Sequence, residues 1–252
     1  MKINHLRAIA DYWNGEAGHY RESHPEHREA TMHPSWGLGH IPESRIGLLA
    51  GALVPGSILV EIGCGQGHDA VAFAELGLNV VAVDLSSRQL KYASPHPNVR
   101  FLKAAAERLP LQNASVDIVI SDHGAFDHSP VGLLLSEASR ILRAGGLLVV
   151  CTWHPLALIC HDPATGTLST RLQAPHPSGR IQFDGKLTGN CLSFSDWFKA
   201  FAEAGFRVER VEELRLPKGA DLYYSDLLDR NWAENWPCDL VWVLRKPGLS
   251  PP

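Results

Sequence analysis

The apolar positions of this chain alternate between two spacings from about residue 57 onward. Short apolar runs predict strands, and runs with a helical period or a capping residue predict helices between them. The predicted strands are 58–62, 80–84, 99–103, 116–121 and 147–152. The predicted helices are 69–76, one from Ser86 or Ser87 to about Tyr92, and one that begins at Ser129-Pro130 and ends at Gly145-Gly146. Such alternation is typical of a parallel sheet with helices on both faces.

The segments on either side of this region have other patterns. Residues 1–45 contain an amphipathic helix at Leu6–Trp13 and a loop at 34–42, and a second helix is expected from Pro42-Glu43 through Leu53. Residues 154–194 are rich in proline, glycine and threonine and have no helical period, which predicts an inserted lid with hairpins near 165–166 and 184–185. A capping-box spacing at Ser193 and Asp196 then begins a helix, and strands follow at 208–211 and 240–244.

These patterns divide the chain into four parts. We expect an N-terminal helical cap at 1–45, the cofactor-binding half of an α/β domain at 46–153, the lid insertion at 154–194, and the C-terminal half of the same domain at 195–252. In a parallel sheet with right-handed crossovers, turns of one kind gather at one edge. The functional site is therefore expected at the carboxyl ends of the strands.

A glycine-rich turn follows the first of these strands. Gly63, Gly65 and Gly67 precede a helix, and the next strand ends on Asp84. Bare backbone amides beside a carboxylate are how such sheets bind an adenosine-containing cofactor. His68 occupies the position where the dinucleotide fingerprint has its third glycine, which counts against a nicotinamide cofactor.

Composition narrows the classes of partner. The chain has 252 residues, 45% of them hydrophobic and 20% charged, with a net charge of −4. A weakly acidic protein is not expected to have nucleic acid as its main partner. The five cysteines are scattered and form no CxxC pair, so we expect neither a disulfide framework nor a cysteine zinc site, and a cytoplasmic location. No apolar run is long enough to predict a membrane span.

Several ordered motifs give the chain a family resemblance. They are Glu61–Gly67, Val83–Ser86, Ala105–Leu111, Val116–Val119 and Ile141–Gly146. Over residues 57–153, and more loosely over 193–247, the sequence resembles the class I S-adenosylmethionine-dependent methyltransferases, in particular the small-molecule branch called type 11. This resemblance implies a doubly wound, Rossmann-like sheet of seven strands, mostly parallel, with the last strand antiparallel.

The resemblance also implies a role for each motif residue. The three glycines would let the methionine part of S-adenosylmethionine lie against the backbone, with Glu61 and Asp69 near its ammonium group. Asp84 would bind the ribose hydroxyls, Leu85 would pack on the adenine, and the backbone amide of Ala106 would reach the adenine ring. Glu107 and Ser121 complete the predicted cofactor contacts. The family usually has an acid where this chain has Ala105.

The acceptor side is expected after the fourth strand of the sheet. Asp122 and His123 are candidates for a general base, or for a pair in which the acid orients the imidazole; alternatively they only contact cofactor or backbone. Aromatic and imidazole side chains that could contact a flat or apolar acceptor, or instead pack the lid's own core, are Trp36, His40, Phe126, His154 and Tyr223. The N-terminal histidines, including His24 and His27, are interpreted as a solvated face, and no metal is expected.

The sequence therefore predicts a methyltransferase that acts on a small molecule by in-line transfer. Residues 1–45, 154–194 and 216–238 would form the lid that selects the acceptor, in a monomer or homodimer with no membrane or nucleic-acid partner. Two alternatives remain: a nicotinamide-dependent oxidoreductase, and a protein that binds the cofactor without catalysis.

Overall fold

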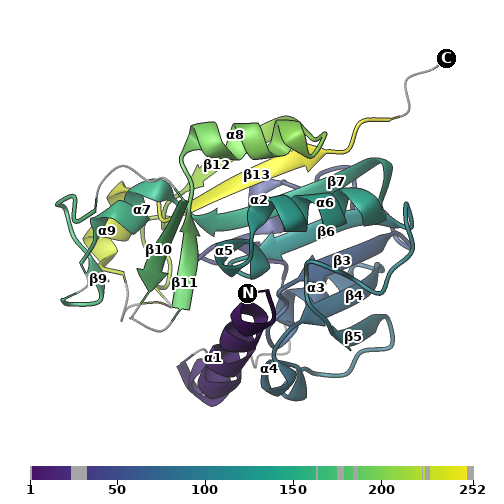
Figure 1. The fold of residues 1–252 in the computed structure, drawn as a ribbon, viewed down its shortest axis with the longest axis horizontal. Helices are drawn as coiled ribbons and strands as arrows, with labels where there is room; N and C mark the ends of the chain where they lie inside the picture. Colours follow the sequence, from purple (N-terminus) through teal and green to yellow (C-terminus); the bar gives the residue numbers. More distant parts are fainter. Residues whose placement is uncertain are drawn as a thin grey trace.

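The computed structural model describes residues 2–23, 33–162, 164–174, 179–183, 187–222, 224 and 228–248. Tyr223, His24 and His27 lie outside these residues. A seven-stranded sheet runs through the molecule (Figure 1) in the order β12-β13-β7-β6-β3-β4-β5. Its strands are β3 (Ile58–Ile62), β4 (Asn79–Asp84), β5 (Val99–Lys103), β6 (Val116–Asp122), β7 (Leu142–Trp153), β12 (Arg207–Leu214) and β13 (Asp239–Arg245).

The strand directions confirm the predicted fold class. Strands β5, β4, β3, β6 and β7 pair in parallel, and β13 pairs antiparallel with both β7 and β12. The order reverses at β3, where β4 lies on one side and β6 on the other. In doubly wound sheets, ligands bind at such a switch point, outside the carboxyl ends of the strands.

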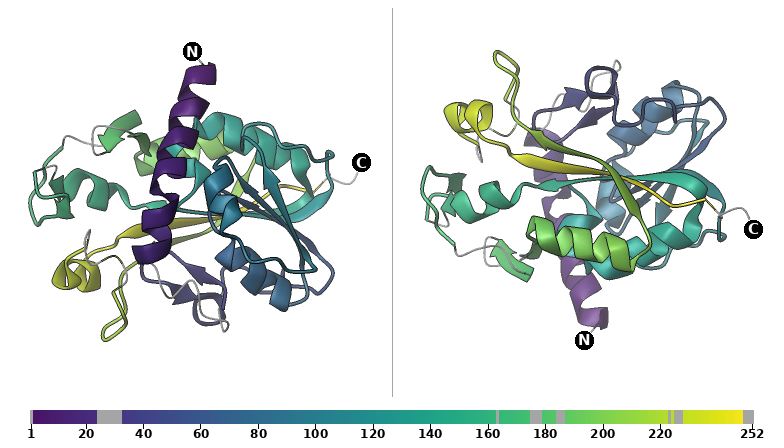
Figure 2. Two further views of the ribbon diagram at one scale, coloured as in Figure 1. Left: turned by 90° about the horizontal axis from the view of Figure 1, so that it is seen from below. Right: turned by 90° about the horizontal axis from the view of Figure 1, so that it is seen from above.

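Helices pack on both faces of the sheet (Figure 2). On one face, α6 (Val131–Ile141) and α8 (Phe194–Glu203) contribute Leu134, Trp197 and Phe201 to a large core. On the other face, α3 (His68–Glu75) contributes Phe73 to a second core. Successive residues of β3 point to opposite faces, so Leu59 joins the second core and Val60 the first. Burial on both faces explains why these strands read as continuous apolar runs.

Two predicted helix starts are present, and the helix predicted after Pro42 is shorter than expected. Ser86 caps α4 (Ser87–Lys91), and Ser193 with Asp196 forms a capping box at the start of α8. The helix expected through Leu53 is only α2 (Glu43–Ile46), which ends at Gly47 in a left-handed conformation. The Glu43 carboxylate accepts hydrogen bonds from the backbone amides of Leu48 and Leu49, and it holds the chain in turns where the helix was expected.

The N-terminal segment lies across the sheet edge that carries the strand ends. Helix α1 (Lys2–Ser23) is longer than predicted, and in Figure 2 (left) it crosses in front of the sheet. The Asn14 Oδ1 atom accepts hydrogen bonds from the Ser86 hydroxyl and from the Arg88 amide. The Gln66 side chain donates to the carbonyl oxygen of Ala17. After α1, a short hairpin of β1 (Ser35–Trp36) and β2 (Ile41–Pro42) lies at the same edge.

The remaining segments gather at one end of the molecule (Figure 1). Residues 154–194 contain the two expected hairpins, β8 (His161–Asp162) with β9 (Thr167–Leu168), and β10 (Gly179–Phe183) with β11 (Leu187–Cys191). They also contain α7 (Pro155–Cys160), a helix that was not predicted because it is too short to show a period. Helix α9 (Arg230–Asn235) packs beside α7 through Trp232 in a third apolar core. Among the described residues, no helix is long and apolar enough to cross a membrane.

Candidate functional site

A cavity of about 460 Å³ opens at the carboxyl ends of the parallel strands. Its wall combines the turns after β3, β4 and β6 with the end of β7, and residues from α1, α7 and the β1–β2 hairpin enclose it. A volume of this size is typical of small-molecule sites, and the switch point of the sheet is where the sequence predicted the site. The predicted residues in its wall are Glu61, Gly63, Gly65, Asp69, Asp84, Leu85, Ala106, Glu107, Asp122, His123 and His40.

The turn after β3 depends on its glycines. Gly63 has φ of 79°, and a Cβ atom there would lie 2.7 Å from the Ala125 nitrogen. A Cβ on Gly67 would clash with the Phe101 ring, and Gly67 lies outside the cavity wall. A Cβ on Gly65 would meet no atom within 4 Å, so this part of the turn borders open space. The turn therefore presents bare backbone to the cavity.

Asp84 is the last residue of β4 and lies beside this turn. Its carboxylate accepts hydrogen bonds from the backbone amides of Gly65 at 2.8 Å and of Ser86 at 2.7 Å. Burial raises the pKa of Asp84 to about 6, and the hydrogen bonds from backbone amides partly oppose that rise. The carboxylate is thus held rigidly at the switch point, where it can accept further hydrogen bonds from a ligand.

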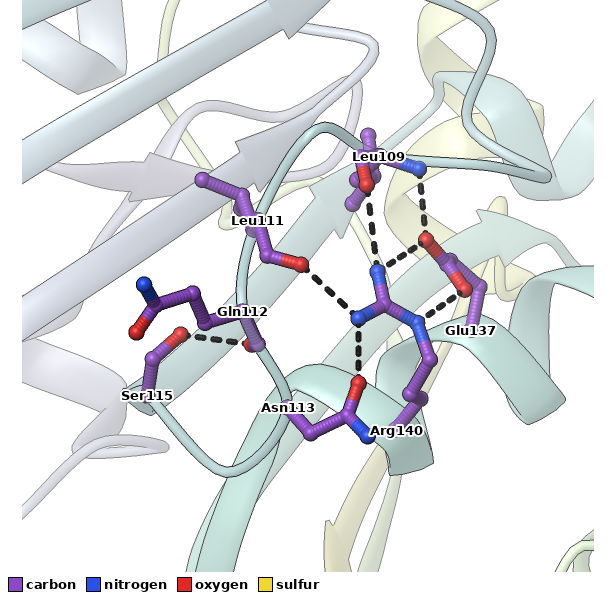
Figure 3. Close-up of polar contacts among 7 residues, drawn as sticks. All are labelled: Leu109, Leu111, Gln112, Asn113, Ser115, Glu137 and Arg140. Atoms are coloured by element: carbon purple, nitrogen blue, oxygen red, sulfur yellow. Dashed lines mark hydrogen bonds and ion pairs between the residues drawn. The ribbon is translucent and has the colours of Figure 1, made fainter.

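The loop after β5 supplies another part of the wall through Ala106 and Glu107. Figure 3 shows how α6 fixes this loop. Glu137 accepts a hydrogen bond from the Leu109 amide at 2.5 Å, and Arg140 donates to the carbonyl oxygens of Leu109 and Leu111. Arg140 also donates to Glu137 itself at 2.6 Å. This bidentate pair therefore holds the loop in place from behind the cavity.

Two further carboxyl groups lie beside the glycine turn. Burial, together with the neighbouring Asp69, Asp122 and Asp84, raises the pKa of Glu61 well above its ordinary value. Its buried Oε2 atom has no hydrogen-bond partner among the described residues. Burial and the charge of Asp122 raise the pKa of Asp69 to about 7, and its Oδ1 atom accepts from the Ser35 amide at 3.1 Å. Unpaired buried carboxyl groups are costly, so this wall favours a ligand that brings positive charge or hydrogen-bond donors.

His123 lies between carboxylates from different parts of the chain. Its Nε2 atom is 2.8 Å from Asp239 Oδ1, and its Nδ1 atom is 3.6 Å from Asp127 Oδ2. Burial lowers the pKa of His123, because it disfavours the charged ring. The hydrogen bond to Asp239 and the negative charges of Asp239, Asp127 and Asp122 have a larger, opposite effect, and the pKa is raised to about 9. His123 is therefore a cation near neutral pH, compensated by its neighbours.

Asp239 and Asp127 are functional candidates that the sequence reading missed. Asp239 begins β13, and antiparallel pairing places it opposite Trp153, at the edge of the sheet that carries the cavity. Asp127 belongs to the short helix α5 (Ala125–His128), and burial raises its pKa to about 7. An acid directly before the apolar run 240–244 was the only sequence signal for Asp239.

The structure places five of the predicted residues away from the cavity wall. Gly67 and Ser121 lie behind it, and Phe126 is fully buried in the first core. Trp36 is buried and donates from Nε1 to Glu43 at 2.7 Å. His154 caps α7 and contacts Glu213 at 2.8 Å. Ala105, where the family usually has an acid, is likewise outside the wall.

One cluster near the site has a geometry that could hold a metal. Ligand atoms of Asp122, His123 and Cys151 lie within 4.8 Å of one another. Burial and the neighbouring carboxylates raise the pKa of the Cys151 thiol well above its ordinary value, and a metal needs the thiolate. The His123 Nε2 atom is already bound to Asp239. We therefore assign no metal to this cluster.

Comparison with known proteins agrees with this geometry. Residues 60–150 match the model of a family described as "Methyltransferase domain". This segment is therefore similar to a methyltransferase domain. A malonyl-[acyl-carrier protein] O-methyltransferase of Pectobacterium atrosepticum is 36% identical over 105 residues, which cover 40% of this chain and 42% of that protein. The chain thus matches about two fifths of the length of such curated relatives.

Solved structures share the fold over most of the chain. A Mesorhizobium loti S-adenosylmethionine-dependent methyltransferase has a TM-score of 0.66 at 23% identity, covering 83% of this chain and all of that chain. A Burkholderia thailandensis 1,6-didemethyltoxoflavin N1-methyltransferase, solved with its substrate and S-adenosylhomocysteine, has a TM-score of 0.63 at 16% identity. That match covers 98% of this chain and 91% of the other. At such identities the likeness concerns the fold.

Proposed function

We propose that this protein binds S-adenosylmethionine and transfers its methyl group to a small molecule. The observation that carries the proposal is the juxtaposition of the Gly63–Gly67 turn with Asp84 in the cavity of about 460 Å³. The match of residues 60–150 to a methyltransferase domain supports it independently.

The wall residues suit the parts of this cofactor. Glu61 and Asp69 would hold the ammonium group of the methionine part, since Glu61 Oε2 is buried without a partner. Asp84 would accept hydrogen bonds from the ribose hydroxyls, because its position is fixed by two backbone amides. Leu85 and the loop at Ala106 and Glu107 would contact the adenine. A cation is also the charge that a buried group of carboxylates stabilises best.

The bound cofactor would supply an electrophilic methyl group on a sulfonium. Alignment of the two reactants can lower the activation barrier of such a displacement by about 7–11 kcal/mol. The main task of the chain is therefore to position the two reactants and to exclude water. Asp122 and His123 line the cavity at the end of β6, and in this proposal they would face the acceptor. Because His123 is held as a cation between Asp239 and Asp127, we assign it an orienting and electrostatic role, and we assign proton acceptance to a carboxylate.

The acceptor would enter from the side of the cavity that is lined by α1, α7 and Tyr224. These elements belong to the segments that the sequence predicts as a lid. Their contribution of Trp13, Leu158 and Tyr224 to the wall supports a role in selecting the acceptor.

The test is transfer of a radiolabelled methyl group from S-adenosylmethionine to compounds in a metabolite extract of the source organism. At a concentration of S-adenosylmethionine below half-saturation, we expect labelled product with the wild-type protein. We expect about tenfold less, or lower, with Asp84→Asn, in which a neutral amide replaces the carboxylate that would bind the ribose hydroxyls. Cofactor binding without any labelled product would contradict the proposed transfer. Equal product from Asp84→Asn would contradict the cofactor site.

A further inference from the structure

The cavity has a second half that the cofactor contacts above do not use. Strands β4 and β5 lie on one side of β3, and β6 and β7 lie on the other. The residues assigned to the ribose and adenine belong to the first side. Asp122, His123, Asp127 and Trp153 belong to the second, and α7 and Tyr224 continue the wall there. This second half, the acceptor half, is where a methyl acceptor fits.

The titratable side chains at the floor of the acceptor half leave an excess of carboxylate. Asp122, Asp127 and Asp239 surround His123, which is the one cationic group among them. The His123 charge is already compensated, since Asp239 lies 2.8 Å from Nε2. An anionic acceptor would therefore meet carboxylates with no uncompensated cation opposite it at this floor, and like charges at close range repel.

Two carboxylate oxygen atoms at this floor, Asp122 Oδ1 and Asp127 Oδ2, are buried without a hydrogen-bond donor among the described residues. Asp127 is 4% exposed and lines the cavity, and its Oδ2 atom accepts no hydrogen bond among the described residues. The nearest charged atom, His123 Nδ1, is 3.6 Å away, which is too far for a hydrogen bond. A buried carboxylate oxygen without a donor is destabilising unless a ligand supplies one.

The acceptor half also has aromatic and apolar side chains in its wall. The Trp153 ring lies edge-on to His123, with 5.4 Å between ring centroids, and Tyr224 lies beside His40 at 6.1 Å. Trp13 of α1 lies beside His128 at 5.8 Å, and Ala157 and Leu158 of α7 complete this wall. Such surfaces bind flat or apolar bodies.

From these contacts we infer that the acceptor is a neutral or cationic compound with an aromatic or apolar body, which donates an N–H or O–H group to Asp127. This inference rests on the proposed methyl transfer and specifies its substrate class. It excludes phosphorylated and carboxylated compounds as acceptors, because they would place an anion against the Asp122 and Asp127 carboxylates.

The reaction balances with the groups present. The nucleophilic atom of the acceptor forms a bond to the methyl carbon, the carbon–sulfur bond breaks, and its electron pair stays on sulfur. The proton that leaves the acceptor passes to the Asp127 carboxylate and from there to solvent. An acceptor held by this hydrogen bond is oriented before transfer, which is where enzymes gain most in such displacements.

The test uses the wild-type protein and divides the metabolite extract by anion exchange at neutral pH. Each fraction is incubated with the protein and methyl-labelled S-adenosylmethionine. We expect labelled product from the unretained fraction, which holds neutral and cationic compounds. Product only from the retained, anionic fraction would overturn the inference and leave the methyl transfer intact. No product from either fraction would overturn the transfer, and the inference with it.

A matched pair of variants then tests the assigned residue. Asp127→Asn removes the carboxylate with little change in shape, and Glu75→Gln removes a carboxylate on the surface of α3. With the active fraction, we expect Asp127→Asn to raise the amount of fraction needed for half-maximal transfer by about tenfold or more, because the hydrogen bond to the acceptor is lost. The maximal rate should fall by about 10²-fold or more, because the proton acceptor is lost as well. The affinity for S-adenosylhomocysteine should stay unchanged, and Glu75→Gln should change none of these quantities. An unchanged half-saturating amount in Asp127→Asn would overturn the role of Asp127.

Discussion

At the scale of single residues, the environment of His123 decides what its imidazole can do. His123 has a φ of 42°, in the left-handed region that residues other than glycine seldom adopt. Its two nitrogen atoms face Asp239 and Asp127. From the sequence, His123 and Asp122 could be selected because they follow a strand at the expected edge. Asp239, 116 residues further on, could not, because only the antiparallel pairing of β13 brings it there.

We predict that Asp239→Asn lowers the pKa of His123 markedly. The negative charge that offsets the burial of the ring is lost, so the folded protein no longer favours the imidazolium. Titration of the His123 ring by NMR measures the change. Glu213→Gln is the matched control, since Glu213 contacts His154 at the same 2.8 Å distance. It should leave the His123 titration unchanged. An unaltered His123 pKa in Asp239→Asn would contradict the account.

At the scale of elements, the local sequence predicted strand ends and helix caps, but it did not predict the short elements. Ser86 and the Ser193–Asp196 box start helices as predicted because capping uses neighbouring backbone amides. The predicted helix after Pro42 failed, since Glu43 binds amides at Leu48 and Leu49. Helix α7 was missed because six residues are too few for a period, and its start depends on the His154 side chain. Tertiary contacts decide such cases.

The glycine turn gives a prediction at this scale. Gly63→Ala would place a Cβ atom 2.7 Å from a backbone nitrogen at a positive φ, so we expect a loss of at least about 2 kcal/mol in the free energy of unfolding. Gly132→Ala in α6 meets no atom within 4 Å, and it should be neutral or stabilising by up to about 1 kcal/mol. Denaturant unfolding measures both. A Gly63→Ala variant as stable as wild type would show that the turn is not tightly packed.

At the scale of the whole molecule, distant segments meet at one sheet edge. Backbone amides of Ser35, Gly37 and Leu38 donate to Asp69, Asp122 and Asp239 respectively. The β1–β2 hairpin is thus tied to the floor of the cavity. The alternation of strands and helices predicted the sheet and the edge that carries the cavity. No local pattern predicted which loop amides donate to which carboxylates. These contacts depend on the fold as a whole.

The buried carboxyl groups make stability depend on pH. The pKa values of Asp69 and Asp127 are raised to about 7 and that of Asp84 to about 6, so the folded state holds protons that the unfolded state releases. Their stabilising contribution is present below about pH 4 and is lost as pH rises through about 6 to 7. Asp69→Asn removes one such group. The Tm of Asp69→Asn minus the Tm of the wild type should therefore increase as the pH is raised from about 5 to about 8, as measured by thermal unfolding. A Tm difference that is constant across this range would contradict the assigned shift.

The proposed function requires that the turn after β3 and the Asp84 carboxylate form a site for an adenosine-containing methyl donor. Titration calorimetry with S-adenosylhomocysteine tests it most directly, because it needs no acceptor. We predict saturable binding at one site per chain, weakened by about tenfold or more in Asp84→Asn. Absence of binding to the wild-type protein, or tight binding of NAD in its place, would contradict the account.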